Sequence, residues 1–232
     1  GPDVLADVEQ AKRKAGTLRY ADSITIDFHK MGWGHYPASA FIVNRRDDLQ
    51  CLFRDVEQVP YFSEAQYRRD PALFTLECSR PAIGPYSVMA SLNGIGLVGY
   101  QILIAHGMEL ARYIRRRLGE LEYCKVLNDR CTGTHAVWWV LPKGRHAGDI
   151  LKKLEAGELA DADAQRYFNE IKHQFDKRNA VRNPERDALL SYTTSMGYNP
   201  RGRALPAWKA VFFNPHTDHR VVDDIITSIE EL

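Results

Sequence analysis

A lysine and a histidine stand side by side in a short segment whose residue types suit covalent chemistry. Lys30 follows His29 at the end of the run 21–30, in which Ile24 and Ile26 alternate with polar residues. The alternation predicts a β-strand, and a turn and a second apolar run come directly after it. A loop lysine held by apolar neighbours can have a lowered pKa, so that its free amine attacks an aldehyde. For a single lysine, an exposed turn residue is the commoner outcome.

Three motifs resemble those of one enzyme family, in the same order and at close to the same spacing. Residues 21–30 read Ala-Asp-Ser-x-x-x-Asp-x-His-Lys, and a turn rich in Gly, Trp and Tyr follows them. Residues 74–81 end in Arg80 and Pro81 before a predicted long helix, and residues 207–215 hold a predicted closing strand. Together they resemble the group II pyridoxal-phosphate-dependent amino acid decarboxylases, and the resemblance covers nearly the whole chain.

The resemblance implies a fold and a domain organisation. The family has the fold type I (aminotransferase-like) architecture, in which a large α/β domain binds pyridoxal phosphate (PLP) and a small C-terminal domain follows. Residues 1–118 resemble the C-terminal part of the large domain, with the lysine segment, a mobile loop over residues 54–73 and a long helix. Residues 119–232 resemble the whole small domain. The expected fold class is therefore α/β plus α+β, the C-terminal portion of a fold type I PLP-dependent enzyme.

The first part of the family's enzymes has no counterpart in this sequence, because only 29 residues precede Lys30. In the family that part supplies an aspartate for the pyridine nitrogen, a histidine that stacks on the ring and most of the phosphate-binding loop. PLP acts as an electron sink only when its ring is protonated, oriented and anchored. We therefore expect a homodimer partner, a complementing N-terminal half, a longer natural protein or a cleaved precursor to complete the site. The chain alone is expected to be inactive.

The resemblance also assigns roles near the cofactor. Lys30 matches the lysine that forms the Schiff base with PLP. His29 and Asp27 match positions that border the cofactor phosphate, to which His29 can donate one ring N–H at neutral pH. Ser23 is a weaker candidate, because a hydroxyl bonded within its own strand is equally consistent with the sequence.

A loop tyrosine is expected to complete the catalytic residues. Residues 54–73 show little periodicity, and a loop of this length is uncommon unless it is functional. Tyr61 falls close to the place where the family's decarboxylases have a mobile tyrosine, which delivers a proton to the substrate carbon after carbon dioxide leaves. Tyr67 competes for this role, because a loop alignment can slip by several residues.

The expected substrate-binding residues depart from the family's pattern. Lys209 stands where the closing strand of the family usually carries an arginine that grips the substrate carboxylate. Lysine offers a point charge and arginine a planar two-pronged donor, so the exchange is not conservative. Arg80, Arg201 and Arg203 are candidates to compensate, and the sequence does not select among them.

The function implied by the resemblance is that of a PLP-dependent L-amino acid decarboxylase, which releases carbon dioxide and an amine from a small amino acid substrate. Two other hypotheses stay open. The chain could be a non-catalytic subunit or fragment that acts in dimer assembly. It could also belong to a PLP enzyme with another reaction, such as transamination, C–C lyase cleavage or oxidative deamination, because one fold serves all of these.

Composition excludes several classes of partner. The formal net charge of +1 over 232 residues argues against a nucleic-acid or anionic-membrane surface. No apolar run approaches the roughly 20 residues of a membrane span, and no signal peptide opens the chain. The cysteines have no CxxC spacing, which favours free thiols in a reducing cytoplasm. They are Cys51, Cys78, Cys124 and Cys131.

Two short motifs are better explained without a ligand. Gly94, Gly96 and Gly99 spell G-x-G-x-x-G, but no strand precedes them, so close helix packing or a helix break explains them better than a dinucleotide. His216 and His219 have an H-x-x-H spacing, but a metal site would need further ligands. No metal is expected.

The remaining periodicity predicts a mixed, mostly antiparallel α+β unit after the long helix. Residues 3–15 are expected to form a short helix or a linker. Helices are expected over residues 47–53, from 85 to about 118, from 161, and from about 217 to the end. Strands are expected over residues 124–128, 136–141, 189–194 and 207–213. The charged stretch 148–160 is expected to be poorly ordered.

Overall fold

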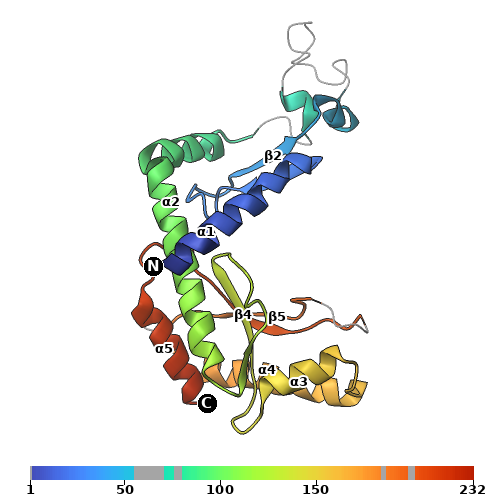
Figure 1. Cartoon of the computed structure of the whole chain (residues 1–232). Helices are drawn as coiled ribbons and strands as arrows, with labels where there is room; N and C mark the ends of the chain where they lie inside the picture. The colour runs from blue at the N-terminus through green and yellow to red at the C-terminus, as the bar shows by residue number, and fades with distance from the viewer. Residues whose placement is uncertain (1, 55–70, 76–79, 184–186, 198–201) are drawn as a thin grey trace, which may run out of the picture. The chain divides into compact units, whose positions relative to one another are not determined.

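A computed structural model of the chain describes residues 2–54, 71–75, 80–183, 187–197 and 202–232 (Figure 1). The chain divides into two compact units, one made of residues 1–11 and 102–232 and the other of residues 12–101. We call them the sheet unit and the lysine unit. The division falls inside the long helix α2 (Ile83–Gly119), whereas the resemblance places the domain boundary at the end of that helix, at 118/119.

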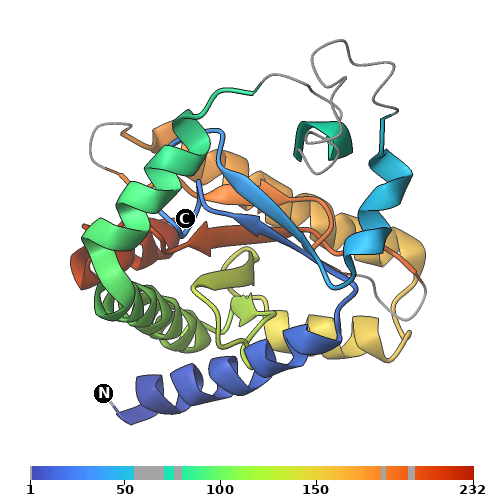
Figure 2. The same ribbon diagram turned by 90° about the horizontal axis from the view of Figure 1, so that it is seen from above.

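The lysine unit is built on a β-hairpin. Strands β1 (Ser23–Asp27) and β2 (Ser39–Val43) pair antiparallel, from Ser23 opposite Val43 to Asp27 opposite Ser39 (Figure 2). Short 3-10 helices precede and follow the hairpin, at Gly16–Tyr20, Arg46–Leu52 and Pro71–Phe74. The strand, turn and strand that the alternation predicts around Lys30 are therefore confirmed.

Helix α2 contains a break at Gly96, whose φ of 66° and ψ of 169° are not helical. A side chain disfavours this backbone conformation, so glycine suits it. The break at Gly96 confirms the helix break that was one of the two structural explanations expected for these glycines. The part of α2 before residue 102 exposes several large apolar side chains: Ile83, Tyr86, Met89, Leu92, Leu97 and Val98.

The expectation that no segment is long and apolar enough to span a membrane was wrong for α2. By length and composition this helix qualifies, and none of its most apolar stretch is buried. Two of its side chains nevertheless bond within the lysine unit, because Ser91 and Tyr100 donate hydrogen bonds to the turn after β1. We therefore treat α2 as a helix of the fold.

The sheet unit contains a four-stranded antiparallel sheet in the order β3-β4-β6-β5. Its strands are β3 (Cys124–Val126), β4 (His135–Val140), β5 (Ser191–Thr193) and β6 (Ala207–Val211). Its helices are the second half of α2, α3 (Ala147–Glu155), α4 (Asp161–Val181) and α5 (His219–Glu230); α1 (Pro2–Ala15) begins in this unit. The mostly antiparallel α+β unit is confirmed.

Tryptophans from the two central strands form the middle of the core. Trp138, Trp139 and Trp208 are fully buried. Trp208 donates its indole N–H to the carbonyl of Ile171 on α4 at 3.1 Å, which fixes that helix against the sheet. Burying three indoles removes a large apolar area from water, and a bonded N–H avoids the cost of an unpaired donor.

Two expectations about the sheet unit were wrong. The stretch 148–160 is not poorly ordered, because helix α3 buries Ala147, Ile150, Leu151 and Leu154 on one face. The many charged residues of this stretch obscured the helical spacing of its apolar residues. That spacing becomes meaningful only when the apolar face packs against the rest of the sheet unit. The last helix, expected from about residue 217, begins only at His219, because Asp218 is its cap: the Asp218 side chain accepts from the N–H groups of Arg220 and Val221.

Candidate active site

The turn after β1 is held by backbone hydrogen bonds that present Lys30 at its edge. The backbone N–H of Lys30 donates to the backbone carbonyl of Asp27 at 3.2 Å, and the N–H of Gly34 donates to the carbonyl of Phe28 at 2.9 Å. Gly32 lies so close to Phe28 that an added Cβ would stand 2.7 Å from the Phe28 carbonyl oxygen. A side chain at this position would therefore force the turn to shift, so glycine suits it.

The Lys30 amine is paired with a carboxylate. Its Nζ lies 2.7 Å from Oδ2 of Asp27, and Ser39 donates its hydroxyl to Oδ1 of Asp27 at 2.8 Å. The hydrogen bond from Lys30 lowers the pKa of Asp27, helped by Ser39, and the same bond raises the pKa of Lys30. The Lys30 side chain is 63% exposed. The expected lowering of the Lys30 pKa by apolar neighbours was therefore wrong, because the hydrogen-bonded Asp27 carboxylate favours the charged amine.

His29 has one ring nitrogen fixed by the fold. Its Nδ1 lies 2.9 Å from the carbonyl oxygen of Ala38, so Nδ1 carries the hydrogen, because a carbonyl can only accept. The ring also packs against Tyr36, with centroids 4.0 Å apart. In neutral His29 the other nitrogen, Nε2, is then an acceptor. Donation to a phosphate through Nε2 would require the imidazolium form, which refines the role expected from the sequence.

The structure does not bring Ser23 close to Lys30. Ser23 begins β1 and Asp27 ends it, on the same face of the strand. At about 3.3 Å per residue, the two positions are roughly 13 Å apart. Ser39, which the sequence does not single out, takes the place beside Asp27, because the hairpin register puts these two residues opposite each other.

Helix α2 supplies three side chains that hold the turn, and the sequence gives no sign of them. The Ser87 hydroxyl accepts from the His35 N–H at 3.1 Å, and Ser91 donates to the Trp33 carbonyl at 3.2 Å. Tyr100 donates to the Gly32 carbonyl at 2.7 Å, and burial raises the pKa of its phenol. These bonds join residues more than fifty positions apart, which no local pattern marks.

The remaining predicted residues are placed only in part. Tyr61, its competitor Tyr67 and Arg201 lie outside the described residues. Arg80 is exposed and precedes α2 in the lysine unit. Their expected roles stay predictions.

Lys209 lies in the middle of β6, opposite Val137 of β4 and Ser191 of β5. It is half-buried, and its charge is one of the causes that lower the pKa of His135, after burial and Arg115. Arg203 donates to the carbonyl of Asp161 and pairs with the Asp161 carboxylate. Lys209 and Arg203 belong to the sheet unit and Lys30 to the lysine unit. Among the described residues, no group of three or more His, Cys, Asp or Glu side chains could hold a metal ion.

The family model described as the pyridoxal-dependent decarboxylase conserved domain matches residues 9–139, more than half of the chain. The chain belongs to this family. The matched part contains the hairpin, Lys30 and the whole of α2.

Curated relatives of the pyridoxal-dependent decarboxylase family match the chain over a shorter stretch. A probable L-aspartate decarboxylase of Pyrococcus abyssi is 29% identical over 104 residues, which are 45% of this chain and 25% of that protein. A probable L-tyrosine/L-aspartate decarboxylase of Methanococcus maripaludis is 32% identical over 104 residues, again 45% of this chain and 25% of that protein. The match thus spans about a quarter of the length of these relatives.

Solved structures of the same fold cover nearly all of this chain. Mouse CSAD in apo form superposes with a TM-score of 0.64 at 15% identity, over 91% of this chain and 39% of that chain. Catharanthus roseus tryptophan decarboxylase in complex with L-tryptophan gives a TM-score of 0.61 at 14% identity, over 93% of this chain and 38% of that chain. At these identities the likeness establishes the fold, which is the expected fold type I portion.

Proposed function

We propose that this chain is the lysine-bearing part of a PLP-dependent L-amino acid decarboxylase, and that Lys30 binds the cofactor covalently. The observation that carries the proposal is the exposed Lys30 amine, which the hairpin and α2 hold at a fixed turn beside Asp27. Membership of the pyridoxal-dependent decarboxylase family supports the same cofactor.

The residues of this turn fit the aldehyde end of the cofactor. An exposed primary amine can reach an aldehyde carbon, and the Nε2 atom of His29 points away from the carbonyl that holds Nδ1. When bound, PLP supplies an electron sink for the pair released from the bond between the α-carbon and the carboxylate. Partners for the ring nitrogen are expected from polypeptide outside this chain.

The chain's own residues have four tasks in this proposal. Lys30 must give up a proton before its nitrogen can bond to carbon, and Asp27 holds the protonated amine in place until then. His29 orients its ring through Ala38 and donates to a phosphate oxygen when it is protonated. Tyr61 delivers a proton to the substrate α-carbon, while Lys209 or Arg80 binds the substrate carboxylate.

The missing part is proposed to come from the portion of the family fold that precedes this chain. Two observations support this: the relatives extend far beyond the matched region, and the first half of α2 leaves apolar side chains such as Leu97 and Val98 exposed. A homodimer is the alternative source. Either arrangement would remove apolar surface from water.

The test is covalent mapping of PLP after borohydride reduction, in the 232-residue chain and in the protein completed by its N-terminal part. We expect an adduct on Lys30 in the completed protein, which Lys30→Ala abolishes, and little adduct in the chain alone. Lys172 is a matched internal control, because it is also an exposed lysine paired with a carboxylate, that of Asp176. Equal labelling of Lys172 and Lys30 in the completed protein would refute the proposal and favour a non-catalytic chain.

A further inference from the structure

Ser39 lies between two of the side chains assigned to the cofactor, at the start of β2. Its hydroxyl donates to Oδ1 of Asp27 at 2.8 Å, and its Oγ lies 3.4 Å from Nδ1 of His29. The one hydroxyl hydrogen goes to the carboxylate, so Oγ is a second acceptor for the Nδ1 hydrogen, beside the carbonyl of Ala38. Because Oδ2 of Asp27 bonds to Lys30 at 2.7 Å, hydrogen bonds connect Lys30 to His29. We call Lys30, Asp27, Ser39 and His29 the Ser39 network.

The hairpin register fixes this arrangement. Asp27 is the last residue of β1, Ser39 is the first residue of β2, and the two are opposite each other. Residues directly opposite in an antiparallel pair have Cβ atoms about 4.5–5.5 Å apart, a gap that a hydroxyl and a carboxylate can bridge. A shift of the register by one residue would turn Ser39 to the other face of the hairpin. The backbone therefore brings Ser39 to Asp27.

Asp27 is the carboxylate that the two ends of the Ser39 network share. Hydrogen bonds from Lys30 and Ser39 lower the pKa of Asp27, and the charges of Lys30 and His29 act in the same direction. In return, the bond to Asp27 raises the pKa of Lys30, and Tyr36 adds to this effect. Asp27 is therefore ionised at neutral pH and faces two basic side chains.

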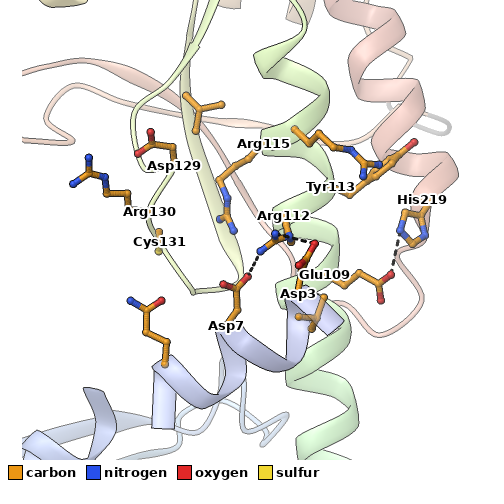
Figure 3. A pocket seen from close by; sticks show the side chains of 14 residues that line it. Asp3, Asp7, Glu109, Arg112, Tyr113, Arg115, Asp129, Arg130, Cys131 and His219 are labelled. Atoms are coloured by element: carbon orange, nitrogen blue, oxygen red, sulfur yellow. Dashed lines mark hydrogen bonds and ion pairs between the residues drawn. The ribbon is translucent and has the colours of Figure 1, made fainter. Parts of the chain in front are cut away.

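The charged pocket of the sheet unit is built differently. It has a volume of about 870 Å³ and lies among α1, α2 and the loop between β3 and β4, and arginines and carboxylates line it in equal numbers (Figure 3). Its Arg112 pairs with two carboxylates, those of Asp3 at 3.1 Å and Asp7 at 3.0 Å. In the Ser39 network one carboxylate serves two basic side chains. When both are protonated, one positive charge is left over, which suits a ligand that carries a phosphate.

The contact with Ser39 matters because the pair of Lys30 and Asp27 is open to solvent. The Lys30 side chain is 63% exposed and that of Asp27 is 33% exposed. Exposed ion pairs contribute little, since two flexible side chains must be held in one geometry. Ser39 holds one of these two partners, through the carboxylate oxygen that Lys30 does not use. It therefore reduces the loss of freedom when the pair forms.

On the basis of the function proposed above for Lys30, we propose that Ser39 is a positioning residue, which holds Asp27 as the shared counter-ion of Lys30 and His29. Before the cofactor binds, Ser39 and Asp27 keep the Lys30 amine protonated and directed to one place. When the amine gives up its proton, Asp27 keeps its bond to Ser39. Its negative charge then stabilises the protonated His29 that donates to a phosphate oxygen.

The first experiment measures how fast individual lysines of the 232-residue chain react with acetic anhydride, by peptide mass spectrometry. The reaction runs at about pH 8, roughly two units below the usual pKa of lysine. Only the unprotonated amine reacts, so the rate at Lys30 relative to Lys172, an exposed lysine paired with Asp176, reports how well Asp27 holds the amine. Ser39→Ala should raise this ratio about 1.5- to 5-fold, the usual effect of losing an exposed ion pair. An unchanged ratio would overturn the proposal.

Three variants of the same hairpin complete this experiment. Ser39→Thr keeps the hydroxyl, and Thr25→Val removes a hydroxyl of β1 that lies opposite Phe41, outside the network; both should leave the ratio unchanged. Asp27→Asn removes the counter-ion and should raise the ratio at least as much as Ser39→Ala. An equal rise in Thr25→Val would show a general loosening of the hairpin and contradict the proposal. Circular dichroism checks folding; if Ser39→Ala does not fold, an unchanged ratio in Asp27→Asn overturns the proposal.

The second experiment follows the reduced PLP adduct on Lys30 in the completed protein as a function of pH. Ser39→Ala should shift adduct formation to lower pH, because less of the amine is held protonated, and Ser39→Thr should keep the original profile. An adduct on Lys30 with the same profile in Ser39→Ala would overturn the role of Ser39 and leave the proposed function intact. No adduct on Lys30 in any variant would refute the proposed function, while the acetylation ratios still decide whether Ser39 positions Asp27.

Discussion

Replacing Gly32 by alanine tests whether a close backbone approach holds the lysine turn. The added Cβ would lie 2.7 Å from the Phe28 carbonyl oxygen and 2.8 Å from the Phe28 Cα. Ordinary contacts between such atoms are about 3.5–4.0 Å, so the two chain segments must separate by up to about 1 Å. Both contacts are with backbone, which cannot rotate away. Overpacking of this kind costs about 1–3 kcal/mol.

Gly94→Ala is the matched control for this substitution. Gly94 lies in α2, and an added Cβ there meets no atom within 4 Å. Alanine is the better helix former, so this variant should gain about 0.5–1 kcal/mol. The same chemical change is therefore expected to act in opposite directions at the two positions.

The assay is amide hydrogen exchange of Gly34, whose N–H donates to the Phe28 carbonyl at 2.9 Å in the turn that would open. Exchange reports local opening, which suits a chain of two units better than a single unfolding midpoint. A cost of 1–3 kcal/mol lowers protection by roughly 5- to 150-fold. Unchanged protection of Gly34 in Gly32→Ala, or a gain equal to that of Gly94→Ala, would refute the reasoning.

Two further predictions concern pH and the loop tyrosine. Burial, with Arg115 and Lys209, lowers the pKa of His135 in the folded protein, so the unfolded chain binds more protons and stability should fall as pH drops below about 6.5. His135→Gln should flatten this loss in urea unfolding measured between pH 7 and pH 5 (roughly the range in which histidine titrates), and an unchanged slope would exclude His135 as its source. In the completed enzyme, Tyr61→Phe should lower amine formation by about 10²–10⁴-fold, the usual effect of losing a positioned general acid, with substrate binding kept. A loss seen with Tyr67→Phe instead would transfer the role to Tyr67.

The sequence alone determined the features that depend on neighbouring residues. The alternation of Ile24 and Ile26 predicted β1, the run after the turn predicted β2, and the motif ending in Lys30 identified the family. Strand periodicity and turn composition are local properties, so they can be recognised in the sequence without knowledge of the fold. The same reasoning predicted close helix packing or a helix break at Gly94, Gly96 and Gly99, because no strand precedes them, and the structure has a break at Gly96.

Only the tertiary structure decided the surroundings of the chemical groups. The Lys30 amine has a raised pKa because the turn brings Asp27 to it and the hairpin register brings Ser39 to Asp27. Tyr100 reaches the turn from 68 positions away. A pKa depends on the charges and the solvent within a few ångströms, and packing alone sets which distant residues lie there.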